Sequence, residues 1–120
     1  MSNQLKKITE QHCSNPPAKY DDLKVLFLNC TLNRTPVLSH TEGLIGVAQR
    51  IFEANGVATK VIRPVDYTIP AGLGLDMSKT PEWDKDDWPM LQKEVDACDI
   101  LILCTSVWLG EKSSVCNRVL

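Results

Sequence analysis

Two apolar runs constrain the fold of this chain more than any other feature. Residues 24–30 (KVLFLNC) and 98–104 (CDILILC) are short stretches made almost entirely of apolar side chains. Such runs are typical of strands that are covered on both faces of a parallel sheet. A further strand is expected between them, at 58–63 (ATKVIR) directly before Pro64, so 98–104 is the third strand in chain order.

A helical pattern lies between the first two expected strands. Ser39, followed three residues later by Glu42, predicts a capping box at its start. Asn55 and Gly56 predict a left-handed stop at its end. Apolar residues recur between these signals at the three- and four-residue spacing of an amphipathic helix. They are Leu44, Val47, Ala48, Ile51 and Phe52.

The order of elements favours an α/β fold. Further helices are expected at about 88–97 and from 113 to 120, so strands and helices alternate along the chain. This alternation implies a parallel sheet with right-handed crossovers. Residues 65–88 are expected to be irregular, and so long a loop in a compact domain is usually functional. Its acidic residues fit no calcium loop and have no histidine beside them, so we expect a solvated acidic loop and no metal site.

Composition narrows the class of protein. The chain has 120 residues and a net charge of −2, which suits one domain and argues against a nucleic-acid or anionic-membrane partner. The five cysteines are odd in number and form no CxxC pair, which favours reduced thiols in a cytoplasmic protein. No run approaches the roughly 20 apolar residues that span a bilayer. Residues 1–23 are expected to form a polar, flexible extension with a short helix near 5–10.

The first loop with chemical interest is 31–41, between the first strand and the long helix. Free N–H groups and the helix dipole favour an anion at such a junction. Hydroxyl and cationic side chains add donors, although no GxGxxG or Walker pattern is present. A capped turn that binds nothing is the alternative, and for His40 the alternative is a solvent-facing side chain. The candidate phosphate-binding residues are Thr31, Asn33, Arg34, Ser39, His40 and Thr41.

The second loop, 105–110, follows the third strand. In a 2-1-3 sheet the first and third strands send their connections to opposite faces, so both loops should border one crevice. Trp108 is suited to lie against a flat ring, and the alternative is that it covers the end of the sheet. The candidate ring-binding residues are Thr105, Ser106, Val107, Trp108, Leu109 and Gly110.

These two loops, in this order, resemble the flavodoxin-like NADPH-dependent FMN reductases over residues 24–120. Such proteins carry a serine, a variable residue and a threonine around the phosphate, as at 39–41 here, and an aromatic residue and a glycine beside the isoalloxazine. The stretch 76–89 also resembles one branch of the group. Two departures stand out: Cys30-Thr31 replaces the usual glycine-serine, and Ser106 replaces the usual proline.

The resemblance implies a flavodoxin-like three-layer sandwich with strand order 2-1-3, whose later strands are absent from this chain. It implies that residues 24–120 form a C-terminally incomplete FMN-binding domain. The implied activity is NAD(P)H-dependent oxidoreduction, with hydride passing from nicotinamide to flavin N5 and electrons then passing to a flavin or quinone. No catalytic side chain is implied. The alternatives are a flavodoxin-type electron carrier and a truncated, non-catalytic fragment. Unpaired sheet edges favour a homodimer.

Overall fold

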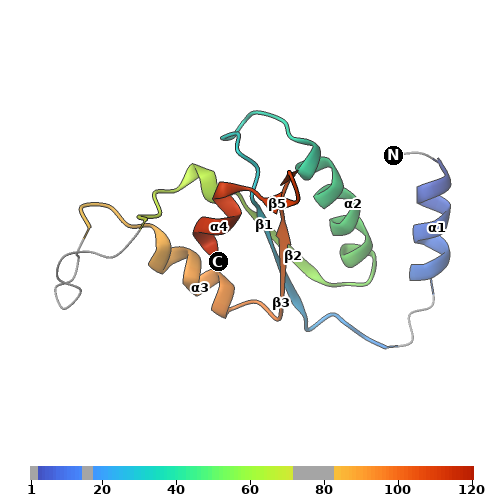
Figure 1. Cartoon of the computed structure of the whole chain (residues 1–120). Coiled ribbons are helices and arrows are strands. Elements are labelled where there is room, and N and C mark those ends of the chain that lie inside the picture. The colour runs from blue at the N-terminus through green and yellow to red at the C-terminus, as the bar shows by residue number, and fades with distance from the viewer. Residues whose placement is uncertain (1–2, 15–17, 72–82) are drawn as a thin grey trace.

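The computed structural model describes residues 3–14, 18–71 and 83–120. The sequence interpretation of residues 72–82, which include Asp76, falls outside these ranges. The helices and strands are labelled in Figure 1. In chain order they are α1 (Asn3–Cys13), β1 (Lys24–Asn29), α2 (His40–Ala54), β2 (Ala58–Ile62), the 3-10 turn η1 (Pro64–Asp66), α3 (Trp88–Asp96), β3 (Ile100–Cys104), β4 (Val107–Trp108), β5 (Glu111–Lys112) and α4 (Ser114–Val119).

The sheet has β1 at its centre. β1 pairs in parallel with β2 on one side and with β3 on the other, so the strand order is β2-β1-β3. Phe27 lies opposite Val61 of β2 and Ile102 of β3. Every residue of β1 after Lys24 is buried, as its continuous apolar run predicts. The α/β class and the 2-1-3 order expected from the sequence are therefore confirmed.

Helices cover both faces of the sheet. Figure 1 shows α2 on one face and α3 and α4 on the other. Alternate side chains of β1 serve the two layers because a strand points successive residues to opposite faces. Phe27 packs with Ile45 of α2, whereas Leu26 and Leu28 pack with Leu91 of α3. The result is a three-layer arrangement with two buried clusters.

The face of α2 that meets the sheet differs from the predicted stripe. Ile45 is the buried residue of this helix, whereas Leu44 is 74% exposed and Ile51 is 42% exposed. Ala48 and Phe52, which the stripe also included, do pack against the core on this face. Ser39 caps the start of the helix and Gly56 follows its end in the left-handed region at φ 77°, both as predicted, whereas the Glu42 half of the capping box is not formed.

The third strand is shorter than the apolar run that predicted it. Cys98 N–H donates to Val95 O, which closes the end of α3. The Asp99 carboxylate accepts the N–H of Lys24 at 2.9 Å. Both residues therefore complete the turn into the sheet, and β3 begins at Ile100.

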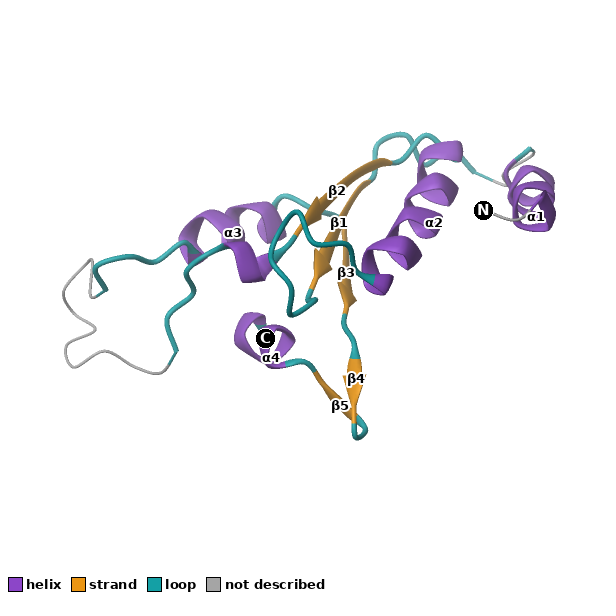
Figure 2. Ribbon diagram, turned by 90° about the horizontal axis from the view of Figure 1, so that it is seen from above, coloured by secondary structure: helices purple, strands orange, loops and turns teal. Residues whose placement is uncertain are grey.

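Two other elements also differ from expectation. The first helix spans Asn3–Cys13 rather than only residues 5–10, and it lies beside α2, where Asn55 Nδ2 contacts Cys13 Sγ at 3.2 Å. The second loop contains a small hairpin, β4–β5, that extends beyond the sheet in Figure 2. Its turn residues, Leu109 and Gly110, have φ of 50° and 83°, the positive φ that tight hairpin turns require. In the described ranges, no helix has the length and apolar character needed to cross a membrane.

Candidate functional site

The first loop ends at a well-formed helix cap. Ser39 has extended backbone, and its Oγ accepts the N–H of Glu42 at 3.1 Å. The second hydrogen bond of the predicted capping box, from the N–H of Ser39 to the Glu42 carboxylate, is not formed. The Glu42 carboxylate instead binds Arg63 Nη2 at 2.7 Å. A guanidinium that is only 8% exposed requires a charged partner. Glu42 therefore serves this buried cation rather than the backbone N–H of Ser39.

Arg63, directly after β2, holds the first loop in place, and the sequence analysis did not identify it. Its Nη1 donates to the carbonyl of Val37 at 2.8 Å and to that of Asn33 at 3.3 Å. Together with Glu42, these partners hold both limbs of the loop against the end of β2. The available sequence signal was weak: a cation at the end of a strand directly before Pro64.

Asp66 holds the middle of the same loop. Its two carboxylate oxygens accept the N–H of Thr35 at 2.9 Å and the Oγ1–H of Thr35 at 2.6 Å. Partial burial raises the pKa of Asp66, but the two hydrogen bonds and the nearby Arg63 and Arg34 outweigh it, so the pKa lies below its ordinary value of 3.8. Asp66 is therefore ionised at neutral pH, and both oxygens can accept.

These contacts restrict which backbone donors are free. The N–H groups of Thr35 and Val37 are bonded within the protein, and Pro36 has none. The N–H groups of Thr35 and Val37 are therefore not available to an anion in this structure. The N–H groups of His40 and Thr41, in the first turn of α2, form no hydrogen bond with any described residue. They are the orphan donors that every helix start offers.

A buried donor without a partner lies at the base of the loop. Asn29 is fully buried, and its Oδ1 accepts the N–H of Thr31 at 3.3 Å. Its Nδ2 is the buried side-chain N or O that finds no partner in the described part of the chain. Buried donors are nearly always bonded, so this carboxamide suits an oxygen-bearing ligand at the carboxyl end of β1. Thr31 is itself buried, whereas Asn33, Arg34 and His40 are exposed.

The second loop is organised by hydroxyl groups. Thr105 Oγ1 accepts the N–H of Ser113 and donates to the carbonyl of Ser106, each at 3.0 Å. Trp108 Nε1 donates to Ser106 Oγ at 2.9 Å. The indole edge is thereby fixed, while the side chain remains 61% exposed. Val107, Leu109 and Gly110 are exposed with it on the hairpin.

Ser113 connects the two loops. It caps α4 by accepting the N–H of Cys116 at 3.1 Å. The same hydroxyl donates to the carbonyl of Cys30, where the first loop begins, at 2.7 Å. A single buried side chain therefore fixes the start of the first loop relative to the helix that follows the second.

Ser113→Ala should lower the free energy of unfolding by about 2–3 kcal/mol, because it removes a helix cap and leaves the buried Cys30 carbonyl without its donor. Ser114→Ala is the matched control, since Ser114 is exposed in the same turn, and a change within about 0.5 kcal/mol is expected. Urea unfolding of both variants provides the comparison. Equal stability of the two variants would contradict the bridging role.

One hollow joins the two loops. It has a volume of about 320 Å³ and lies between α2 and β3, with Thr41 from the first loop and Thr105 from the second among its lining residues. The structure thus brings these two predicted residues together. The remaining lining residues are Phe27, Leu44, Ile45, Ala48, Ile102, Leu103 and Cys104.

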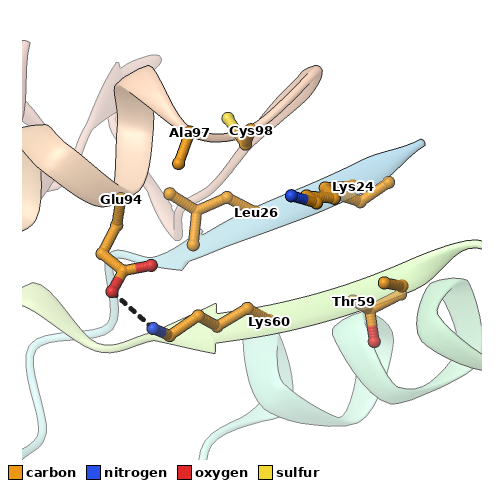
Figure 3. Close-up of a pocket in the computed structure, with 9 residues that line it drawn as sticks. Lys24, Leu26, Thr59, Lys60, Glu94, Ala97 and Cys98 are labelled. Carbon is orange, nitrogen blue, oxygen red and sulfur yellow. Dashed lines mark ion pairs between the residues drawn. The ribbon is translucent and has the colours of Figure 1, made fainter. Parts of the chain in front are cut away.

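A separate hollow of about 260 Å³ lies at the opposite end of the sheet, where β1 and β2 begin. Figure 3 shows its charged rim, in which Lys60 Nζ and Glu94 Oε1 form an ion pair of 2.6 Å. None of the predicted site residues lines it. Because ligands of open α/β sheets bind at the carboxyl ends of strands, the candidate site is the hollow between the two loops.

The cysteine at the start of the first loop is not a nucleophile. Burial raises the pKa of Cys30 to about 12, and the neighbouring thiols of Cys116 and Cys104 add to the effect. Cys30 is therefore a neutral thiol at physiological pH, since the thiolate is the reactive form. All five cysteines are free thiols in this structure.

Comparison with known proteins identifies the family. Residues 23–120 match the family model described as NADPH-dependent FMN reductase. A curated relative, 8-demethyl-8-aminoriboflavin-5'-phosphate synthase of Streptomyces davaonensis, is 34% identical over 102 residues, which are 82% of this chain and 40% of the relative. A second, the divalent metal cation transporter MntH of Mycobacterium bovis, is 42% identical over 112 residues, which are 93% of this chain and 16% of that protein.

A solved structure gives the same result. The crystal structure of RosB with the bound intermediate 8-demethyl-8-formylriboflavin-5'-phosphate matches with a TM-score of 0.72 and 33% identity. The match covers 81% of this chain and 40% of that one, so the chain spans less than half the length of these relatives. The fold is flavodoxin-like, and the chain belongs to the NADPH-dependent FMN reductase family.

Proposed function

We propose that this chain binds FMN between its two loops and takes part in the reduction of that FMN by NAD(P)H. The observation that carries the proposal is the hollow between α2 and β3, which is lined by both Thr41 and Thr105. Membership of the FMN reductase family and the riboflavin phosphate in the matched crystal structure support a phosphorylated flavin as the ligand.

The phosphate end is assigned to the start of α2. The free N–H groups of His40 and Thr41 and the hydroxyls of Ser39 and Thr41 are the donors. Helix starts bind anions because these N–H groups and the helix dipole point at the ligand. The unpartnered Nδ2 of Asn29 provides a further donor beneath the loop. A dianionic phosphate requires this density of donors.

The ring end is assigned to the β4–β5 hairpin. Trp108 presents an exposed indole whose edge is fixed by Ser106 Oγ, a geometry suited to stacking on a flat aromatic ring. Bound flavin fluorescence should then be quenched by the indole, and Trp108→Leu should relieve that quenching. Fluorescence of the bound flavin in both proteins provides the measurement. Equal quenching in both would place Trp108 away from the ring.

Bound FMN would supply the redox chemistry, which is hydride transfer from NAD(P)H and electron transfer to a flavin or quinone. The residues of this chain hold the phosphate, place the ring and provide hydrogen-bond donors. No side-chain acid, base or nucleophile is required, and Cys30 remains a neutral thiol beneath the loop.

A second role for the flavin follows from the relatives. One is a synthase of an aminated riboflavin phosphate, and the other structure holds a formylated riboflavin phosphate as an intermediate. In both cases the flavin phosphate is named as the product or the intermediate of a reaction. The same site could therefore hold riboflavin phosphate as a substrate, and analysis of the flavin after turnover distinguishes the two roles.

Steady-state oxidation of NAD(P)H tests the proposed reductase activity. The protein loaded with FMN should oxidise NADH or NADPH in the presence of a quinone or free flavin, and the flavin recovered by chromatography should be unchanged FMN. A protein that binds FMN but does not accept electrons from either nicotinamide is an electron carrier or a non-catalytic fragment. Recovery of a modified flavin would indicate the substrate role.

The free edge of β3 supports a homodimer. Among the described residues, β3 pairs only with β1, and its Leu101 and Leu103 are 42% and 37% exposed. Such an edge is a template for pairing with another strand. Light scattering should therefore give the mass of a dimer, and Leu101→Lys, which places a charge on this strand, should give a monomer. A monomeric wild-type protein would contradict pairing through this edge.

A further inference from the structure

Two side chains, those of Arg63 and Asp66, hold the first loop at every second residue. Both come from the turn that follows β2, which is called the corner below. Arg63, at the end of β2, binds the carbonyls of Asn33 and Val37. Asp66, three residues later in η1, binds the N–H and the hydroxyl of Thr35. The loop is therefore anchored at residues 33, 35 and 37, and the first turn of α2 is anchored through Glu42.

These anchors determine the direction of other backbone groups. In a planar trans peptide the carbonyl of one residue and the N–H of the next point in opposite directions. Because the carbonyls of Asn33 and Val37 point to Arg63, the N–H groups of Arg34 and Leu38 point away from it. Neither N–H forms a hydrogen bond with a described residue. Arg63 therefore leaves two donors facing the other side of the loop.

We propose that Arg63 and Asp66 are positioning residues that preset the 31–41 loop for a phosphate monoester. Discrimination between FMN and riboflavin then depends on this corner rather than on the exposed side chain of Arg34. The inference rests on the proposed function, in which this loop holds the flavin phosphate. Neither Arg63 nor Asp66 needs to contact the ligand.

The arrangement of the guanidinium, rather than its charge, carries this role. The charge of Arg63 is paired with Glu42 at 2.7 Å, and its guanidinium is largely removed from the solvent surface. A lysine at this position would keep the charge but lose the two separate donor nitrogens, because a single ammonium cannot reproduce the fixed, planar donor geometry of a guanidinium. Asp66 acts in the same way, since its ionised carboxylate accepts two bonds from one residue.

The test compares Arg63→Lys and Asp66→Ala with the wild-type protein by equilibrium titration with FMN and with riboflavin. Lys60→Gln is the matched control, because it removes a different ion pair, the one between Lys60 of β2 and Glu94 of α3 (Figure 3). Both corner variants should bind FMN roughly 10- to 100-fold more weakly, the range for one or two lost charge-assisted hydrogen bonds. Riboflavin affinity should change less than about twofold in the same variants, because riboflavin has no phosphate to position. The control should bind both flavins as the wild type does.

Wild-type FMN affinity in folded Arg63→Lys and Asp66→Ala proteins would overturn the inference, and so would an equal loss for both flavins. Asp66 is exposed, so its variant remains informative where Arg63→Lys fails to fold. Hydrogen exchange of the Thr35 amide in ligand-free protein gives an independent readout. Failure of the wild-type protein to bind either flavin would refute the proposed function but not the anchoring of the loop. Faster exchange of the Thr35 amide in Asp66→Ala than in Lys60→Gln would then still support the anchoring of the loop by Asp66. Equal exchange rates in the two variants would refute it.

Discussion

Replacing both Ser39 and Thr41 with alanine should weaken FMN binding by roughly 2–4 kcal/mol, at about 1–2 kcal/mol for each charge-assisted hydrogen bond. Both residues lie at the start of α2, where Ser39 caps the helix and Thr41 lines the hollow shared by the two loops. A phosphate at this helix start would accept hydrogen bonds from both hydroxyls and from the free N–H groups of the first turn. Flavin titration monitored by fluorescence provides the measurement.

Ser39 also stabilises the helix, so its loss has a second effect that must be separated. Ser39→Asp is the matched control, because aspartate is an equally good helix cap but places a carboxylate against the phosphate. The aspartate variant should retain wild-type stability and still lose FMN affinity. Unchanged FMN affinity in the double alanine variant would show that this loop is not the phosphate site.

Phe27→Ala should lower the free energy of unfolding by about 3–5 kcal/mol, the range for removing a large buried aromatic side chain. Phe27 is completely buried at the centre of β1. Its ring meets that of Phe52 edge to face, with centroids 6.0 Å apart and planes at 72°. The substitution therefore removes the contact between Phe27 and Phe52 of α2, and it leaves a cavity beside the hollow that Phe27 lines.

Val61→Ala is the control for Phe27→Ala, because Val61 lies opposite Phe27 on β2 and is 38% exposed. Val61→Ala should lower the free energy of unfolding by less than about 1.5 kcal/mol. Urea unfolding, with equal slopes for both variants, gives the comparison. A cost at Phe27 no larger than that at Val61 would show that the core is not centred on β1.

The sequence predicted the sheet well because burial on two faces leaves a clear signal. The apolar run around Phe27 can only suit a covered strand, and alternation with helices then fixes a parallel sheet. The helix cap at Ser39 was also predictable, because the capping signal consists of two residues three apart in the chain. The matched family confirms the resemblance that the two loops carried.

Other features depend on contacts that a sequence pattern does not show. The face of α2 was misjudged because Leu44 and Ile45 are adjacent, and packing against β1 selected Ile45. The β4–β5 hairpin has only two residues per strand, too few to show an alternation. Arg63 binds carbonyl groups 26 and 30 residues away, and a backbone acceptor has no residue type to recognise.

The site was therefore predictable at the level of its loops but not of its donors. Hydroxyl residues at a helix start indicated an anion, whereas the use of the Thr35 and Val37 amides by Asp66 and by Arg34 became visible only in three dimensions. The unpartnered Nδ2 of Asn29 likewise follows from burial, which no local pattern gives.

Equilibrium titration of the wild-type protein with FMN and with riboflavin tests the central claim most directly, because the two ligands differ only in the phosphate assigned to the start of α2. FMN should bind more tightly than riboflavin by at least tenfold, roughly the effect of one or two charge-assisted hydrogen bonds. Its fluorescence should be quenched on binding by the indole of Trp108. Equal affinity for the two flavins, or no binding of either, would contradict a flavin phosphate site between the 31–41 loop and the β4–β5 hairpin.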